Sequence, residues 1–319
     1  MSSKQNIPSK IKSAIKYRKF LFDDETTTAF RIFNSDGDGI NGLTIDFFDG
    51  YYLITWFNTT AYQKKKEIVK ELKLSPFYKG IYQKKKFSSN DKDPDDLPDF
   101  ICGDEAPSPL IIKENNINFA IHLDDGAMVG IFLDQRDVRK TIRDKYSEGK
   151  TMLNTFSYTG AFSVSSALGG ATKTTSVDLA KRSLSKTKEQ FQINNIDLEK
   201  QSIVVEDVFH YFKYAVKKNL LFDLLVLDPP SFARTKKITF SVAKDYVKLL
   251  KEAIQITEKN GVIAASTNYA NLTMNDFKGF IDKAFKELKG DYKIEEIFGV
   301  PKDFKNSHYL KVVFIRKIR

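Results

Sequence analysis

The segment FDLLVLDPPSFARTKK, from Phe222 to Lys237, says most about the fold of this chain. Its first six residues, Phe222 to Leu227, are mostly apolar, which is typical of a strand buried on both faces of a sheet. Asp228 follows, and the two prolines after it hold the backbone in extended geometry. Ligands of open α/β sheets bind at the carboxyl edge of the strands. The segment therefore predicts an α/β fold with a ligand site at Asp228, although alone it also fits a strand that ends in a proline turn.

The same segment suggests which chemistry this edge performs. Neither proline has an N–H group, so the Asp228 side chain and nearby carbonyls are left to accept hydrogen bonds from a planar amine or a base edge. An aromatic side chain two residues after the prolines could stack on that base. We expect three catalytic residues: Asp228, Pro229 and Phe232. The substrate-binding residues that we expect are Phe232, Arg234, Lys236 and Lys237.

From Thr151 onward the pattern of strand, loop and helix repeats, as a doubly wound parallel sheet requires. Two further apolar runs near the end have no helix between them, so they should pair antiparallel. The pattern predicts a seven-stranded, Rossmann-like mixed sheet with an antiparallel hairpin at its C-terminal end. The expected strands are Thr151–Phe156, Thr174–Asp178, Ser202–Val205, Phe222–Leu227, Gly261–Ser266, Lys293–Phe298 and Tyr309–Arg316.

Before this sheet the chain alternates short strands and turns, which predicts a small α+β domain. LTIDFF-DG-YYLITWF is a hairpin pattern, a second hairpin is expected to turn at Asn115-Asn116, and a helix is expected over Tyr62 to Leu72. Lys84 to Asp104 is polar and predicts an exposed loop, and a strand after Met128 should pass into a helix capped by Asp134. The expected division is a basic arm at 1–24, the α+β domain at 25–109, a hairpin connector at 110–134 and the sheet domain at 135–319.

Composition narrows the class of protein. The formal net charge is +10, and clusters at 64–66, 84–86 and 234–237 permit a nucleic-acid partner, although each alone is more typical of a solvated surface. One cysteine and three dispersed histidines predict neither a disulfide framework nor a metal site. No apolar run has membrane-spanning length, and no signal peptide is recognisable. We expect a cytoplasmic protein without membrane contact; its oligomeric state stays open, a homodimer included.

The turn LNTFSYTGAFS, Leu153 to Ser163, points to the cofactor. A dinucleotide site requires three glycines so that a pyrophosphate can approach, and only Gly160 is present. S-adenosylmethionine, which has an adenosine and no phosphates, fits better. Asp178 ends the second strand, where an acid holds ribose hydroxyls; Asp207 after the third could accept from the adenine amine while Val208 covers the ring. Each acid alone could simply cap a helix, but together with Asp228 they form a joint pattern.

Six segments make a resemblance specific: DGDGINGLTIDFFDGYYLITW, GIFLDQRDVRK, LNTFSYTGAFSV, SVDLAKRSLSKTKEQFQINNI, DLLVLDPPSFAR and YLKVVFIR. With them the chain resembles the RlmI-type family of class I S-adenosylmethionine-dependent 23S ribosomal RNA large-subunit methyltransferases. The resemblance implies a class I methyltransferase fold and a ribosomal RNA substrate. It implies that Gln135 and Arg136 close the site over the methionine part, where the residues alone suggest a helix cap. It also implies cofactor roles for Phe156, Ser157, Thr159, Gly160, Asp178 and Asp207.

Two departures from the family pattern matter. Full-length members begin with an RNA-binding domain of PUA type, which we do not expect in this chain, so we expect the arm and the region from Phe30 to Pro109 to dock RNA. Members that methylate a cytosine carbon are expected to have a cysteine near the fifth strand, where this chain has Thr267 and Asn268. A threonine hydroxyl is a poor nucleophile without an adjacent base, and Cys102 lies in the connection before the sheet, where an ordinary thiol is expected.

The sequence therefore favours direct methyl transfer to a base taken out of its helix, with the base and the atom open. Three alternatives remain. The first is a cytosine-carbon methyltransferase with a cysteine nucleophile. The second is a methyltransferase for a small metabolite, and the third is an RNA-binding protein without catalysis.

Overall fold

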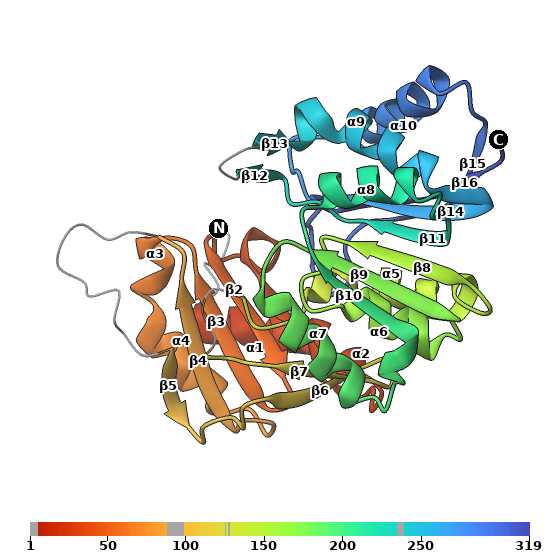
Figure 1. Cartoon of the computed structure of the whole chain (residues 1–319). Helices are drawn as coiled ribbons and strands as arrows, with labels where there is room; N and C mark the ends of the chain where they lie inside the picture. The colour runs from red at the N-terminus through yellow and green to blue at the C-terminus, as the bar shows by residue number, and fades with distance from the viewer. Residues whose placement is uncertain (1–5, 88–98, 125, 127, 235–238) are drawn as a thin grey trace. The chain divides into compact units, whose positions relative to one another are not determined.

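The computed structural model describes residues 6–87, 99–124, 126, 128–234 and 239–319. The chain forms two compact units (Figure 1). Unit 1 comprises Met1–Leu133 and Pro301–Ser307, and unit 2 comprises Asp134–Val300 and His308–Arg319. Unit 1 therefore contains three parts that the sequence analysis treats separately, namely residues 1–24, 25–109 and 110–133. The segment Pro301–Ser307, between the last two strands of the chain, also belongs to this unit.

Unit 2 is built on a seven-stranded sheet with the order β10-β9-β8-β11-β14-β16-β15. The first five strands in that order run parallel, and β16 pairs antiparallel with both β14 and β15. This confirms the predicted class I methyltransferase fold with its C-terminal hairpin. The strands are β8 (Thr151–Thr155), β9 (Lys173–Asp178), β10 (Gln201–Val205), β11 (Phe222–Leu227), β14 (Thr257–Thr267), β15 (Tyr292–Phe298) and β16 (Lys311–Lys317).

Helices cover both faces of this sheet, which explains why β11 is apolar from Leu224 to Leu227. Leu225 and Leu227 point into the core beneath α8, α9 and α10, whereas Leu224 and Val226 point to the opposite core with α5 and α6. Figure 1 shows α8, α9 and α10 on one side of the sheet and α5 and α6 on the opposite side. The helices are α5 (Arg136–Thr141), α6 (Ala161–Leu168), α7 (Arg182–Gln192), α8 (Val208–Lys217), α9 (Val242–Gln255) and α10 (Met274–Glu287). A π-helical turn at Ile142–Tyr146 and a 3-10 turn at Leu198–Lys200 complete the connections.

Unit 1 holds a five-stranded sheet with the order β1-β2-β3-β4-β5 and the two-stranded hairpin β6-β7. Both predicted hairpins are confirmed: Asp49-Gly50 and Asn115-Asn116 have positive φ at both central residues, as a type I′ turn requires. The strands are β1 (Ala29–Asn34), β2 (Leu43–Phe48), β3 (Tyr51–Trp56), β4 (Gly80–Lys85), β5 (Phe100–Gly103), β6 (Leu110–Glu114) and β7 (Ile117–Ile121). Unit 1 also contains a 3-10 turn at Ser35–Asp38 and the short helices α3 (Thr59–Tyr62) and α4 (Lys65–Leu72).

The segment expected to be a basic arm folds, over its described residues, into α1 (Ile7–Tyr17) and α2 (Lys19–Phe22). Ile11 and Ala14 are buried in the core of unit 1. Arg18 is fully buried and donates two hydrogen bonds to the carboxylate of Asp38, at 2.9 and 2.7 Å, and others to the carbonyl of Asp303. The segment is therefore part of a packed core, because its apolar face and one of its charges have partners far along the chain.

Two local predictions are wrong. Lys84 to Asp104 is not one loop, because β4 extends to Lys85 and β5 begins at Phe100; residues 88–98 lie outside the described part. No strand forms among the described residues 128–133, and a 3-10 turn at Leu133–Gln135 leads into α5. Asp134 does not cap that helix, because its carboxylate accepts a hydrogen bond from the Tyr309 hydroxyl at 2.8 Å.

Candidate active site

Three acids meet one edge of the sheet of unit 2. Asp178 ends β9, Asp207 follows β10 and Asp228 follows β11, and these strands are parallel within the order β10-β9-β8-β11. The carboxyl ends of parallel strands share an edge, so the sheet brings the predicted acids to the side at which ligands of this architecture bind.

The turn between β8 and α6 is tightly constrained. Phe156 and Tyr158 have positive φ, 53° and 51°, which is uncommon for residues other than glycine and clusters at functional sites. Gly160 has a φ of 78°, and a Cβ there would lie 2.5 Å from Cγ2 of Thr187 on α7. A side chain at this position therefore requires the Thr187 side chain to shift. Ser157 and Thr159 are buried in the same turn.

Asp178 fastens this turn to the sheet. One of its oxygens accepts the Tyr158 N–H and the other accepts the Ala180 N–H, both at 2.8 Å. Each carboxylate oxygen has a second lone pair, so the side chain is held in place and can still accept from a vicinal diol. The strand-end acid thus acts as a local structural anchor and offers the acceptors that a ribose requires.

Asp207 has the role that strand-end aspartates often have, because its side chain caps α8 by accepting the His210 N–H at 3.1 Å. Glu206, which the sequence interpretation did not assign, accepts the Asp207 N–H at 2.9 Å and lies 3.1 Å from His210 Nδ1. These two contacts lower the pKa of Glu206. Val208 is buried at the start of α8.

Asp228 lies at the centre of a hydrogen-bonded group. Its Oδ1 accepts from the Ser266 hydroxyl and from Nε2 of Gln135, the latter at 3.3 Å. The Tyr246 hydroxyl donates to the Ser266 carbonyl at 2.9 Å and so supports β14 at this point. Burial raises the pKa of Asp228 to about 6; the Ser266 hydrogen bond opposes the shift and the charge of Asp134 adds to it. The two hydrogen bonds thus orient the Asp228 carboxylate, and its pKa lies well above the ordinary value for an aspartate.

Ser266 is the residue of this group that the sequence interpretation missed. Leu227 pairs with Ala265 across β11 and β14, so the next positions, Asp228 and Ser266, lie opposite each other. The signal in the sequence was the polar end of the apolar run VIAAST, but it identifies a partner for Asp228 only once the two strands are known to be adjacent.

The structure contains buried polar atoms that a cofactor could satisfy. Gln135 and Arg136 are both buried, and Oε1 of Gln135 has no hydrogen-bond partner within the described part of the chain. The same holds for the buried hydroxyl of Ser157 in the β8–α6 turn. Unpaired buried polar groups cost free energy unless a ligand completes them. With the diol acceptors of Asp178, these residues fit a polar nucleoside cofactor such as S-adenosylmethionine.

Of the residues expected to act on or bind the substrate, Pro229 is buried, and Phe232 on β12 (Phe232–Arg234) exposes 61% of its surface. Strand β12 pairs with β13 (Thr239–Ser241) as a short ribbon. The Ser231 hydroxyl donates to Oδ1 of Asn268 at 2.5 Å, which ties the proline turn to the end of β14. The Arg234 side chain, Lys236 and Lys237 lie outside what the structure describes.

Cys102 belongs to unit 1 and lies on β5, not in a loop as expected. Its Sγ is 3.6 Å from the Tyr78 hydroxyl, and its side chain packs against the core of that unit. Within the described residues, no group of three or more His, Cys, Asp or Glu side chains could hold a metal ion. The described helices also include none that is long and apolar enough to cross a membrane.

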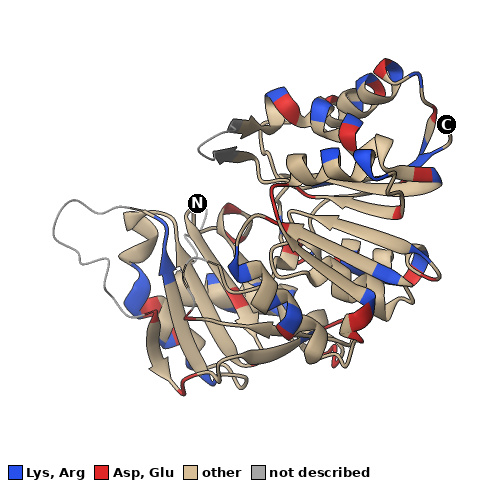
Figure 2. Ribbon diagram, viewed as in Figure 1, with Lys and Arg blue, Asp and Glu red and all other residues tan. Residues whose placement is uncertain are grey.

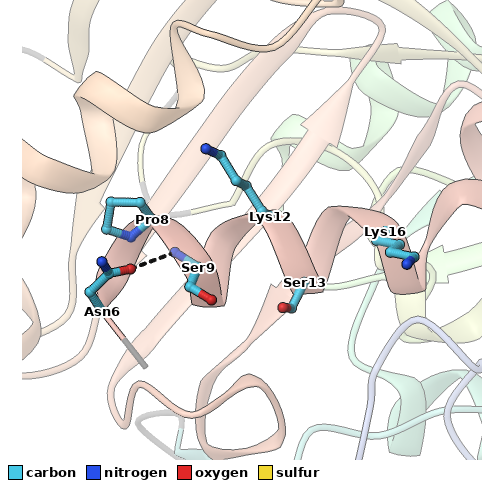
Figure 3. Close-up of a pocket in the computed structure, with 6 residues that line it drawn as sticks. All are labelled: Asn6, Pro8, Ser9, Lys12, Ser13 and Lys16. Atoms are coloured by element: carbon cyan, nitrogen blue, oxygen red, sulfur yellow. Dashed lines mark hydrogen bonds between the residues drawn. The ribbon is translucent and has the colours of Figure 1, made fainter. Parts of the chain in front are cut away.

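A hollow of about 350 Å³ lies along α1 in unit 1 (Figure 3). Asn6 caps the start of this helix, because its side chain accepts the Ser9 N–H at 3.0 Å. The Lys12 Nζ lies 3.4 Å from Oε1 of Glu71. The hollow holds none of the acids of the sheet edge, so we assign it no part in the chemistry. Its lining residues are Asn6, Pro8, Ser9, Lys12, Ser13 and Lys16.

Comparison with known proteins identifies the family of this chain. The profile of the S-adenosylmethionine-dependent methyltransferase family matches residues 31–305. A Bacillus subtilis protein with the provisional name ribosomal RNA large subunit methyltransferase YwbD is 55% identical over 97% of this chain and 80% of its own length. The ribosomal RNA large subunit methyltransferase I of Pseudoalteromonas translucida is 30% identical over 90% of this chain and 72% of its own. The crystal structure of SMU.776, provisionally named a methyltransferase and solved with S-adenosylhomocysteine, has a TM-score of 0.91 and 41% identity, covering 99% of this chain and 83% of its own.

Proposed function

Because the chain belongs to the S-adenosylmethionine-dependent methyltransferase family, we propose that it methylates a base of large-subunit ribosomal RNA. Two relatives named for that activity support the choice of substrate, and so does the net charge of +10. The observation that carries the proposal is the Asp228 carboxylate, held by Ser266 and Gln135 at the sheet edge close in sequence to the exposed Phe232.

We assign the cofactor contacts as follows. Asp178 accepts the ribose hydroxyls, and Asp207 and Val208 border the adenine. Oε1 of Gln135 and the Ser157 hydroxyl gain partners in the amino-acid part, over which Arg136 also closes. Phe156, Thr159 and Gly160 shape the turn that lies against the cofactor. When bound, the cofactor supplies a methyl group that its sulfonium already activates for transfer.

Direct transfer to a nitrogen fits the residues at Asp228. The Asp228 carboxylate accepts a hydrogen bond from the amine or ring N–H of the base, which fixes the nitrogen lone pair toward the methyl group. The methyl group would pass from the sulfonium to the nitrogen, the electron pair of the S–C bond would stay on sulfur, and the Asp228 carboxylate would accept the proton that the nitrogen loses. Phe232 stacks on the flipped base, and Arg234, Lys236 and Lys237 bind adjacent phosphates.

The alternative of a cytosine carbon as acceptor requires a thiol to add to the ring. The chain has one cysteine, Cys102, on β5 of unit 1, where its Sγ contacts the Tyr78 hydroxyl. Thr267 and Asn268 occupy the end of the fifth strand. We therefore assign the chemistry to Asp228 rather than to a thiolate.

Nucleoside mass spectrometry tests the proposal. Ribosomal RNA from cells with and without the gene should differ by one methylated nucleoside in the large subunit, which the wild-type gene restores and an Asp228→Asn copy does not. Identical nucleosides, together with methylation of a small metabolite by the purified enzyme, would contradict the proposal. A missing 5-methylcytidine would instead restore the cysteine mechanism.

A further inference from the structure

The proline turn that follows β11 is fastened to the end of β14 by two side-chain hydrogen bonds. The Ser266 hydroxyl donates to the Asp228 carboxylate, and the Ser231 hydroxyl donates to Oδ1 of Asn268 at 2.5 Å. Ser266 and Asn268 are two positions apart, and these contacts show that both side chains face the turn. The first hydrogen bond orients the acceptor that we propose for the base, and the second orients an amide group.

The backbone on both sides of Asn268 is held in place. Thr267 ends β14 and pairs with Lys311 of β16. The Tyr269 N–H donates to Oγ1 of Thr267 at 3.2 Å, and the Tyr269 carbonyl accepts from the Lys311 Nζ at 3.0 Å. Thr267 and Lys311 are buried, whereas Asn268 is exposed. Asn268 therefore presents an exposed side chain on a fixed backbone.

The Asn268 amide has one end that is satisfied and one that is open. The Ser231 hydroxyl binds the oxygen, Oδ1, so the nitrogen, Nδ2, points to the other side of the planar group. Within the described part of the chain, Nδ2 donates to no other group. An amide nitrogen carries two N–H donors, and both are available here at the carboxyl edge of the sheet.

The neighbours of this amide are the groups that we propose for the target base. Phe232 directly follows Ser231 in the chain and exposes 61% of its surface. Asp228, three positions before Ser231, supplies an acceptor. A base offers a flat face, N–H groups and acceptor atoms along its edges. A ring, an acceptor and a donor at one turn match the three kinds of contact that a flipped base makes.

We infer that Asn268 is a specificity-determining residue, which donates from Nδ2 to an acceptor atom of the target base, a carbonyl oxygen or a ring nitrogen. The inference rests on the proposed function and adds to it a donor that complements the Asp228 acceptor. Because Ser231 and the backbone already hold this side chain, it loses little conformational freedom when the base enters. A base without an acceptor at that position leaves the amide unpaired and is rejected.

The test uses purified full-length variants, S-adenosylmethionine with a labelled methyl group and large-subunit ribosomal RNA from cells without the gene. Asn268→Asp keeps an oxygen for Ser231 but replaces the Nδ2 donors with a carboxylate oxygen, which repels an acceptor atom. The value of kcat/KM should fall about 100-fold, because the base loses a hydrogen-bond donor that the site was built to supply. A purely structural tie between the turn and β14 would survive this substitution, so a wild-type kcat/KM would overturn the inference.

Two uncharged variants separate the donor from the tie. Ser231→Ala removes the tie but keeps both N–H donors of Asn268, so kcat/KM should fall about fivefold, the effect of one hydrogen bond between uncharged groups. Asn268→Ala removes the tie and the donors together and should lose at least about fivefold more. If the two variants had equal kcat/KM values, the tie alone would account for the effect and Asn268 would have no contact with the base.

Asn271→Asp controls for the added charge. Asn271 is exposed three positions after Asn268, and its side chain forms no hydrogen bond within the described residues. Helix α10, which begins shortly after it, carries both basic and acidic residues (Figure 2), so the extra carboxylate meets a surface of mixed sign. This variant should retain the wild-type kcat/KM. A loss equal to that of Asn268→Asp would point to general repulsion of RNA and contradict the inference.

Failure of the inference and failure of the proposed function give different results. The affinity for S-adenosylhomocysteine and the circular dichroism spectrum, measured on every variant, should match the wild type and show that unit 2 is folded. Transfer to RNA by the wild type with no loss in Asn268→Asp would overturn the inference alone. A wild-type enzyme that transfers no methyl group to the RNA would overturn the proposed function and the inference with it.

Discussion

Asp228 has an environment that favours its protonated form, although the proposed chemistry requires the charged one. Burial raises its pKa to about 6, whereas an unfolded chain has an aspartate pKa near 3.9. The native protein therefore holds this proton to higher pH than the unfolded chain does. The free energy of unfolding should fall as pH rises from about 4 to about 6 through this group. Retaining the carboxylate costs stability, which is common at catalytic positions.

We predict that Asp228→Asn stabilises the protein and inactivates it. Asparagine keeps an oxygen for Ser266 and Gln135 but carries no charge, so the free energy of unfolding at pH 7 should rise by about 1–3 kcal/mol. Methyl transfer should fall at least about 100-fold, since the acceptor for the substrate N–H is weakened. Urea unfolding at pH 4, 6 and 7 measures the first effect, and the advantage of the variant should vanish at pH 4. A destabilised variant at pH 7 would contradict this account of Asp228.

Asp178 differs, because it already has two backbone donors. Asp178→Ala removes an acceptor for two ribose hydroxyls and frees the Tyr158 and Ala180 N–H groups, which should weaken S-adenosylhomocysteine binding by about 2–3 kcal/mol in calorimetry. Asp197→Ala is the matched control, because Asp197 also accepts a backbone N–H, from Glu199 at 2.9 Å, but lies before β10 at the opposite edge. Equal losses in both variants would remove the cofactor role from Asp178.

At the scale of elements, the β8–α6 turn depends on a glycine at position 160. Gly160→Ala should lower the free energy of unfolding by about 2–4 kcal/mol, because alanine is strained at a φ of 78° and its Cβ would clash with Thr187. Gly149→Ala has a similar φ, 69°, but open space around the Cβ, so it should cost only about 1 kcal/mol. Denaturant unfolding compares them. If both substitutions lowered the free energy of unfolding equally, the Thr187 side chain would have moved aside without cost.

The sequence predicted the elements of the sheet well and their long-range partners poorly. β11 and its acid were recognisable because burial on both faces makes the strand apolar from Leu224 to Leu227, and Asp228 ends this run. Ser266 could not be assigned to Asp228, since their contact depends on which strands are neighbours. For the same reason Asp134 was interpreted as a cap, although the Tyr309 hydroxyl, far along the chain, binds its carboxylate.

The N-terminal helices illustrate the same limit for charge. Counting lysines and arginines before Asp23 suggests a free basic arm, yet Arg18 is buried in an ion pair with Asp38. We predict that Arg18→Ala lowers the free energy of unfolding by about 3–5 kcal/mol, because Asp38 is left buried with a weakened counter-charge. Lys16→Ala, at an exposed position of α1, the helix that ends just before Arg18, should change the free energy of unfolding by less than about 0.5 kcal/mol. If Arg18→Ala and Lys16→Ala both had small effects, the N-terminal segment would be a free basic arm rather than part of the core.

At the scale of the whole molecule, the residues that we propose for cofactor binding and methyl transfer all belong to unit 2. The last two strands of unit 2 are joined through Pro301–Ser307, which belongs to unit 1, and Asn34 of β1 donates to the Lys305 carbonyl at 2.8 Å. The chain thus passes between the two units at several points.

Direct transfer at Asp228 is the central claim, and one assay tests it most directly. Purified wild type, Cys102→Ala and Asp228→Asn are each given S-adenosylmethionine with a labelled methyl group and large-subunit ribosomal RNA from cells without the gene. The account predicts that Cys102→Ala retains wild-type transfer, whereas Asp228→Asn loses at least about 100-fold while still binding S-adenosylhomocysteine. An inactive Cys102→Ala enzyme with normal cofactor binding, or a covalent adduct between Cys102 and a fluorinated cytosine, would contradict it.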